Sequence, residues 1–197
     1  MDSVRGKLSG QEGKNIMILM SEVQTQPPKR YRSELQALVY RKLQELEILF
    51  ERVDTEEVIT MKDCEDINQK RHMKMVKTLF LCTRHQREMF LFITTGDRRF
   101  DSNSFSTELG VSRVSFAPEQ SMEEMLGTKI GAATVFSVLL KSADSVRVVI
   151  DWDVLKEEYY GCSDGTTTGY MKVKTQDIVA KLLPESGHSY VLYKRQK

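Results

Sequence analysis

Seven consecutive residues from Val76 to Cys82, with the sequence VKTLFLC, give the clearest β-strand pattern in the chain. Because alternate side chains of a strand point to opposite faces, Leu79 and Leu81 share one face and Phe80 lies on the other. Both faces are therefore expected to be buried. The apolar segment from Met89 to Thr94 follows after a short polar connection and is the expected hairpin partner. This pair of strands places a sheet at the centre of the fold.

Helical patterns occur on both sides of this hairpin in the sequence. Ser33 opens a capping box, in which its hydroxyl accepts a hydrogen bond from a free amide and Gln36 reaches back. The apolar residues that follow repeat at intervals of three and four, which predicts a helix of about fourteen residues. Five further helices are expected. One begins at Thr60, one ends at Gly110, and one runs from a second capping box at Ser121 to Gly127. Another begins with Asp153 as its N-cap, and the last runs from Thr175 to Leu183 and ends before Pro184.

Short strands complete the pattern. They are expected at residues 48–53, 114–117, 134–140, 146–150, 170–173 and 189–193, with 134–140 and 146–150 joined as a hairpin. Helices and strands are mixed without the strict alternation of a parallel βαβ sheet. The predicted fold class is therefore α+β, with a mixed, mainly antiparallel sheet or half-barrel surrounded by helices.

One domain is expected behind a flexible N-terminal tail. Residues 1–30 are polar and contain three glycines and two adjacent prolines, so they form the tail, and residues 31–197 form a domain large enough for one core. A composition of 40% hydrophobic and 29% charged residues fits a globular protein rather than a disordered one. The apolar run at residues 16–20 is too short for a signal peptide or a bilayer span, which predicts a cytoplasmic protein without membrane association. Met20 is an alternative natural start.

The cysteines, histidines and charges narrow the classes of function. The three cysteines are Cys64, Cys82 and Cys162, and the three histidines are His72, His85 and His188. Their spacing fits neither a disulfide framework nor a zinc site, so no metal and no cofactor are predicted. The 29 basic residues nearly balance the 28 acidic ones, which disfavours binding along a duplex. A DNA-binding role would need a basic face, for which Lys70–Lys74 is the compact candidate, although this run equally fits a solvated helix end.

Lys77 is the first candidate for chemistry, because it interrupts an apolar strand. A lysine in that position must find an anion, extend to water or lose its charge. The alternative is an ordinary lysine at a strand end, whose stem carries the charge to solvent. Asp151 and Asp153 are not expected to be a catalytic pair, since Asp153 is better explained as a helix N-cap, and His188 has no visible partner for nucleophilic catalysis.

Two glycine-containing loops are the other candidates. The small residues of Gly127–Thr134 leave backbone amides open to an anion or a ribose hydroxyl, although a tight turn before a buried strand explains them equally well. The loop lacks the G-K-[ST] sequence of a P-loop. The second loop, Gly161–Gly169, carries four hydroxyl groups and is either a binding loop with many donors or an ordinary polar surface loop.

Several of these segments occur in an order that resembles the free-standing prolyl-tRNA editing proteins of the YbaK/ProX aminoacyl-tRNA deacylase family. The resemblance extends from about Tyr40 to Tyr193. It rests on LEILFERVD at Leu46–Asp54, TMKDC at Thr60–Cys64, VKTLFLC at Val76–Cys82, SFA at Ser115–Ala117, IDWDVL at Ile150–Leu155 and KVKTQDI at Lys172–Ile178. No one of these motifs is decisive, but the ordered set is specific.

The resemblance implies hydrolysis of the ester that joins a wrong amino acid, typically alanine, to proline tRNA, without a metal. Lys77 stands where the family has a strand lysine, and it would hold or polarise the substrate near the terminal nucleotide. Backbone donors would stabilise the developing oxyanion. The implied substrate-binding residues are Gly131, Ala132, Ala133, Thr134, Gly161, Ser163, Thr167 and Thr168. The implied partners are the acceptor end of aminoacylated tRNA and prolyl-tRNA synthetase.

The chain departs from the family pattern at four positions. Val135 ends the glycine-led loop where relatives have proline, Ser163 and Thr167 replace a histidine and an asparagine of the amino-acid pocket, and Thr55 replaces a frequent histidine. Three consequences are open: a different aminoacyl group, reduced catalysis, or a catalytically silent module of the same fold that binds tRNA ends or an amino acid.

Overall fold

The computed structural model describes residues 20–57, 67–68 and 73–194, and every structural statement below concerns these residues. The helices are α1 (Glu34–Glu45), α3 (Ser102–Leu109), α4 (Glu119–Leu126), α5 (Trp152–Leu155), α6 (Thr175–Asp177) and α7 (Leu183–Glu185). The strands are β1 (Phe50–Asp54), β2 (Lys74–Thr83), β3 (Met89–Thr95), β4 (Val114–Phe116), β5 (Val146–Asp151), β6 (Tyr159–Ser163), β7 (Gly169–Lys174) and β8 (Tyr190–Tyr193). Short 3₁₀ segments occupy Arg84–Gln86, Val135–Leu139 and Lys141–Ala143, and the π-helical turn Ile178–Leu182 joins α6 to α7.

The strands form one mixed sheet in the order β1-β7-β6-β2-β3-β5-β8, with β4 paired to β2 outside this path. The pairs β1–β7, β6–β7, β2–β3 and β2–β4 are antiparallel, whereas β2–β6, β3–β5 and β5–β8 are parallel. The long strand β2 joins the two halves, because only its first two residues, Lys74 and Met75, pair with β6. The predicted α+β class and mixed, mainly antiparallel sheet are confirmed.

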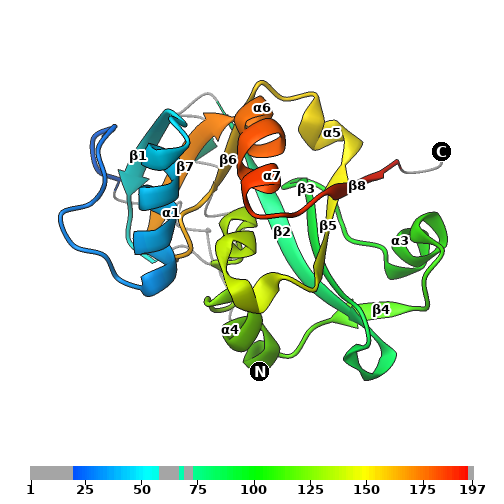
Figure 1. The fold of residues 1–197 in the computed structure, drawn as a ribbon. Helices are drawn as coiled ribbons and strands as arrows, with labels where there is room; N and C mark the ends of the chain where they lie inside the picture. The colour runs from blue at the N-terminus through cyan, green and yellow to red at the C-terminus, as the bar shows by residue number, and fades with distance from the viewer. Residues whose placement is uncertain (1–19, 58–66, 69–72, 195–197) are drawn as a thin grey trace, which may run out of the picture.

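One face of the sheet is covered by helices. Figure 1 shows α1, α4 and the continuous helical segment α6–α7 in front of the strands. The main core lies between these helices and the sheet. Each large apolar side chain that it buries contributes about 1.5–3 kcal/mol. Its members include Leu35, Val39, Tyr40, Leu43, Phe80, Leu126, Phe136, Tyr160, Cys162, Ile178 and Leu182.

The opposite face carries two smaller clusters instead of one continuous core. The Met75 cluster consists of Val53, Ile67, Met73, Met75 and Tyr170. The Leu81 cluster consists of Leu81, Phe90, Phe92, Phe105, Val114, Val149 and Tyr193. Lys77 lies on β2 between Met75 and Leu81, on the same face as both, because it is separated from each by an even number of residues. The sheet therefore presents a polar position between two apolar clusters.

Several sequence predictions are confirmed. Ser33 caps α1 by accepting a hydrogen bond from the Gln36 amide, β2 and β3 form the expected antiparallel hairpin, and Gly110 ends α3 in a left-handed conformation. Gly127 likewise ends α4 with φ of 62°. The helix expected from Thr60 lies outside the described residues.

Three local predictions are wrong. Residues 134–140 are not a strand and form no hairpin with 146–150: Val135–Leu139 is a largely buried 3₁₀ segment, in which Ser137 donates to the carbonyl of Leu126 at 2.9 Å, and β5 pairs with β3 and β8 instead. The capping box at Ser121 does not form, because α4 already begins after Pro118 and Ser121 lies inside the helix. Asp153 is not the N-cap of α5; the Asp151 carboxylate accepts the Asp153 amide instead.

The segment from Met20 to Gln26, which was predicted to be tail, contacts the outer edge of β1. Gln24 and Arg52 exchange two backbone hydrogen bonds of 2.8 and 2.9 Å, and the Arg52 Nε donates to the carbonyl of Gln26. These contacts place at least this segment against the domain. Residues 1–19 lie outside the described part, so the domain boundary at residue 31 stays a prediction. Within the part of the chain that the structure covers, no helix is long and apolar enough to cross a membrane.

Candidate functional site

A row of polar side chains crosses the sheet at the level of Lys77. Lys77 on β2 is directly opposite Thr94 on β3, so the two side chains share a face. The Thr94 hydroxyl donates to the Asp151 carboxylate at the end of β5 at 2.7 Å. Thr94 and Asp151 are buried, with 3% and 2% of their surfaces exposed. The row therefore places a lysine and a buried carboxylate on neighbouring parts of one sheet face.

The Lys77 ammonium group has a defined partner in this row. Its Nζ donates to the backbone carbonyl of Arg98 at 2.7 Å. The Arg98 guanidinium in turn binds the Asp153 carboxylate and lies 3.8 Å from Asp151 Oδ2. The sequence analysis did not expect Asp151 and Asp153 to be a catalytic pair. In the structure both carboxylates face the Arg98 guanidinium.

Strand β6 brings the second glycine-containing loop to the same face. Met75 is in register with Gly161 in the parallel pair β2–β6. Lys77 and Ser163 are each two residues further along their own strands, so each points to the same side as Met75 and Gly161, although the pairing of β2 with β6 ends at Met75. Gly161 is required for this approach, because a Cβ there would lie 2.9 Å from the Lys74 carbonyl oxygen. The structure thus gives Gly161 a role in strand packing.

The first loop is attached to the second by three side-chain hydrogen bonds. Ser163 donates to the carbonyl of Ala132 at 3.0 Å, and Thr134 donates to the carbonyl of Ser163 at 2.8 Å. Thr128 donates to the carbonyl of Gly165 at 3.0 Å. Ala132 and Thr134 are fully buried, whereas Gly131 is exposed and has φ of 87°. The left-handed conformation at Gly131 lets the chain turn from the surface into this buried segment.

Asp164 organises the second loop from inside. Its carboxylate is fully buried and accepts hydrogen bonds from Gln36 Nε2 at 2.7 Å, from the Tyr40 hydroxyl at 3.0 Å, and from the amide and hydroxyl of Thr166 at 3.2 and 2.7 Å. Burial, followed by the charge of Asp164, raises the pKa of the Tyr40 phenol, so Tyr40 stays a donor at neutral pH. A Cβ at Gly169 would overlap this carboxylate. Residues 163–169 are therefore a largely buried, hydrogen-bonded loop and not an ordinary polar surface loop.

The two loops border a cleft of about 720 Å³. Its lining includes Thr128, Lys129, Gly165, Thr166, Thr167 and Thr168, together with Arg32, Ser33 and Glu57. At its rim, one Glu57 carboxylate oxygen accepts hydrogen bonds from Lys129 at 2.9 Å and from Thr167 at 3.0 Å. These two donors, Lys129 first, lower the pKa of Glu57. Thr167 is thus engaged by the chain itself, while the backbone of Thr168 accepts the amide of Thr55.

The predicted site residues therefore form one hydrogen-bonded group, the two loops, and a separate residue, Lys77. The loop residues, from Gly131 to Thr134 and from Gly161 to Thr168, are joined by the hydrogen bonds above. Lys77 shares a sheet face with Ser163, but its described hydrogen bond goes to Arg98 and not to either loop. The sequence analysis missed Thr94, Arg98 and Asp164. Arg98 was not identifiable in this role, because its contact to Lys77 uses a backbone carbonyl that every residue has.

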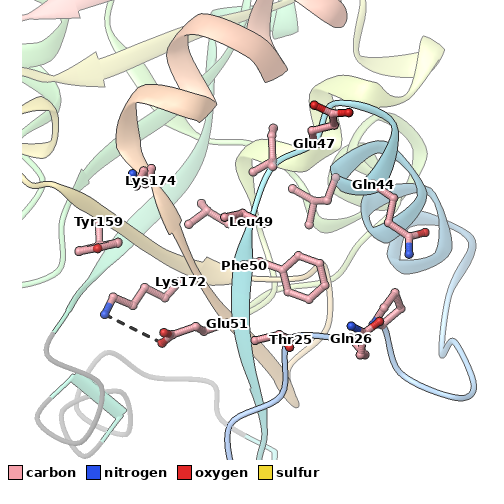
Figure 2. Close-up of a pocket in the computed structure, with 14 residues that line it drawn as sticks. Thr25, Gln26, Gln44, Glu47, Leu49, Phe50, Glu51, Tyr159, Lys172 and Lys174 are labelled. Atoms are coloured by element: carbon pink, nitrogen blue, oxygen red, sulfur yellow. Dashed lines mark ion pairs between the residues drawn. The ribbon is translucent and has the colours of Figure 1, made fainter.

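A second cavity, of about 620 Å³, lies at the edge strand β1 and includes none of the predicted site residues. Figure 2 shows Tyr159, Lys172 and Glu51 on one side of this strand and Phe50 and Gln44 on the other. The Lys172 ammonium lies 4.0 Å from the Glu51 carboxylate and 4.2 Å from the centre of the Tyr159 ring.

The described residues contain no group of three or more His, Cys, Asp or Glu side chains placed to hold a metal ion.

Comparison with known proteins identifies the family to which this chain belongs. Residues 55–181, more than half of the chain, match the profile of the aminoacyl-tRNA editing domain, and the chain belongs to this family. It is 24% identical over 152 residues to the prolyl-tRNA editing protein ProX of Acetoanaerobium sticklandii, covering 77% of this chain and 92% of that protein. It is 32% identical over 123 residues to the prolyl-tRNA synthetase associated domain-containing protein 1 of Mus musculus, covering 60% and 71%.

Solved structures agree on the fold. A proposed trans-editing enzyme for prolyl-tRNA synthetase superposes with a TM-score of 0.60 at 16% identity, covering 85% of this chain and 99% of that one. The crystal structure of hypothetical protein APE2540 gives a TM-score of 0.61 at 15% identity, covering 79% and 97%. The resemblance of the sequence to the prolyl-tRNA editing proteins is confirmed by the family match and by the likeness to ProX.

Proposed function

We propose that this protein acts in trans to hydrolyse the ester bond of mischarged aminoacyl-tRNA, with alanine on proline tRNA as the first candidate substrate. The observation that carries the proposal is the position of Lys77. It lies between two apolar clusters, on the sheet face that also bears Ser163, and the backbone of Ala132 reaches that same face through its bond to Ser163. A lysine charge on this face suits a substrate that carries a phosphate close to its ester bond.

The proposed reaction needs no covalent intermediate on the protein. Water adds to the ester carbonyl, the carbonyl oxygen gains negative charge, and collapse releases the amino acid and the free ribose hydroxyl of the tRNA. Lys77 would hold the terminal nucleotide by its charge and fix the ester beside the loops. Positioning of this kind can supply a large part of a rate enhancement, because it removes the entropic cost of bringing the reacting groups together. Neither a metal nor a cofactor is required in this scheme.

The amino acid would be selected by size beside the first loop. The residues of that loop are small, with glycine at 131 and alanine at 132 and 133, so a small side chain is expected to fit and proline to be excluded. An active site sized for one amino acid cannot reject a smaller one by binding alone, and a separate editing site corrects the error. Prolyl-tRNA synthetase is the proposed source of the mischarged tRNA, in the cytoplasm.

A catalytically silent module that binds tRNA ends or an amino acid is the second candidate. It is favoured by the hydroxyls of Ser163 and Thr167, which stand where relatives have a histidine and an asparagine. Both are already engaged inside the protein, Ser163 with the Ala132 carbonyl and Thr167 with Glu57. If those hydroxyls stay engaged when substrate binds, the polar contacts that place the amino acid are reduced.

Deacylation of a panel of mischarged tRNAs separates the two candidates. The panel contains alanine, serine and cysteine on proline tRNA, with correctly charged proline tRNA as the control substrate. Hydrolysis of a panel member above the uncatalysed rate, with prolyl-tRNA spared, is the expected result and identifies the preferred amino acid. Binding of charged tRNA without turnover of any member would reject the hydrolase and leave the binding module.

A further inference from the structure

The ammonium group of Lys77 is held by a structure that extends beyond the lysine itself. A lysine ends a flexible stem and carries three N–H donors. One donor of Lys77 goes to the carbonyl of Arg98, and this is its partner among the described residues. That single bond to a backbone oxygen determines where the charge lies on the sheet face. The position of the Lys77 charge therefore depends on the position of residue 98.

Arg98 is held in place by its backbone amide and by its side chain. Its amide closes a turn on the carbonyl of Thr95 at 3.2 Å, directly after β3. Its guanidinium binds Asp153 in α5 and faces Asp151 at the end of β5. The turn is thus tied to a neighbouring strand by charge, and about a third of the Arg98 side chain, 34%, is exposed.

Asp151 is placed to do this by two further bonds. One carboxylate oxygen caps α5 by accepting the Asp153 amide at 3.1 Å, while the other accepts the Thr94 hydroxyl and faces Arg98. Burial of a carboxylate to 2% exposure costs free energy unless a charge partner and hydrogen bonds compensate for the lost water. The cap alone uses one oxygen, so it does not explain why an arginine faces the other.

We propose that Arg98 and Asp151 are positioning residues that hold the Lys77 ammonium at the editing site. The inference deepens the proposed function, on which it rests. Arg98 acts through its backbone carbonyl, and its side chain and Asp151 keep that carbonyl in place. Neither residue contacts the substrate in this scheme. Loss of the clamp is expected to leave Lys77 present but free to move among several rotamers.

The test compares Arg98→Ala with Lys77→Ala and with the double variant. Arg98→Ala keeps the carbonyl and removes only the clamp. It is expected to lower kcat about tenfold with a small change in KM, since a displaced catalytic geometry costs rate more than binding. In the Lys77→Ala background the same change is expected to have no further effect.

Arg147→Ala is the matched control, because it removes an arginine with one ion pair, to Glu88 at 2.9 Å, elsewhere on the sheet. This variant is expected to leave kcat unchanged.

A second readout does not depend on activity. The rate at which a small acylating reagent modifies Lys77, measured by peptide mass spectrometry, reports how firmly the amine is held. A several-fold faster modification in Arg98→Ala and Asp151→Asn, with Arg147→Ala like wild type, supports the inference. Equal rates in all four proteins overturn it, as does an additive loss of kcat in the double variant. If wild type hydrolyses no mischarged tRNA, the proposed function fails, and the modification rates still decide whether the clamp exists.

Discussion

Replacement of Asp164 by asparagine should destabilise the protein strongly, although it preserves the size of the side chain. All four groups that surround the carboxylate are donors: Gln36 Nε2 and the Tyr40 hydroxyl on one oxygen, the amide and hydroxyl of Thr166 on the other. An asparagine keeps one acceptor oxygen and turns an NH₂ group toward the remaining two donors. Of those two donors, the hydroxyl can rotate to accept from the NH₂ group, but the N–H group of Gln36 or of the Thr166 amide cannot, so one buried hydrogen bond is replaced by a donor–donor contact and the charge is lost from the others.

The magnitude follows from the number of bonds. Hydrogen bonds to a charged group contribute about 1.5–3 kcal/mol each, and a buried unsatisfied donor costs about 1–3 kcal/mol. Allowing for partial relaxation, Asp164→Asn should lower the free energy of unfolding by about 3–4 kcal/mol. Tyr40→Phe removes only one donor and should cost about 1–2 kcal/mol. These are large fractions of the roughly 5–15 kcal/mol available to a domain of this kind.

Urea unfolding followed by circular dichroism measures both values. The midpoint should fall while the slope m stays constant, because the exposed surface of the unfolded chain is unchanged. Asp144→Asn, at an exposed position after the 3₁₀ turn, is the matched control and should change stability by less than about 0.5 kcal/mol. A change of that small size in Asp164→Asn as well would refute the idea that this carboxylate organises the loop.

Two other predictions concern the same region. Gly169→Ala should lower the free energy of unfolding by about 2–4 kcal/mol, because its Cβ would overlap the Asp164 carboxylate. Gly110→Ala meets open space and should cost about 1–2 kcal/mol for its left-handed conformation alone. Urea unfolding compares the two variants, and equal costs would contradict the overlap. Burial raises the pKa of the Cys162 thiol, so at pH 8 this cysteine should resist iodoacetamide until the protein unfolds, and the buried Cys82 should resist it because the reagent cannot reach it; mass spectrometry detects the adducts, and rapid alkylation of Cys162 in buffer would be the contrary result.

The sequence predicts those parts of the fold that depend on local chemistry. The alternation in Val76–Cys82 identifies both the strand and the face on which Lys77 lies, because strand periodicity is independent of what the strand pairs with. The cap at Ser33 and the glycine at position 110 are equally local. The same reasoning fails for residues 134–140, where β-branched and apolar residues suit a strand but are buried in a 3₁₀ segment between α1, α4 and the sheet.

The site is only partly predictable for a related reason. The sequence identifies Lys77 and the two loops as candidates, and the loops do contact one another through Ser163 and Thr134. It does not identify Asp164, since D-G-T is typical of an exposed turn and only tertiary contacts from α1 reveal a buried carboxylate. Arg98 is hidden for the same reason, because the pairing of its side chain with Asp153 spans 55 residues of sequence.

The central claim is that the working site lies on the face of β2 that carries Lys77. The most direct test is single-turnover hydrolysis of proline tRNA that carries alanine, with Lys77→Ala compared with Lys74→Ala. Lys74 belongs to the same strand but lies on the opposite face, is 68% exposed and binds Glu157. The account predicts a loss of about 100-fold or more in Lys77→Ala and a rate within about twofold of wild type in Lys74→Ala. Wild-type rates in both variants would contradict it.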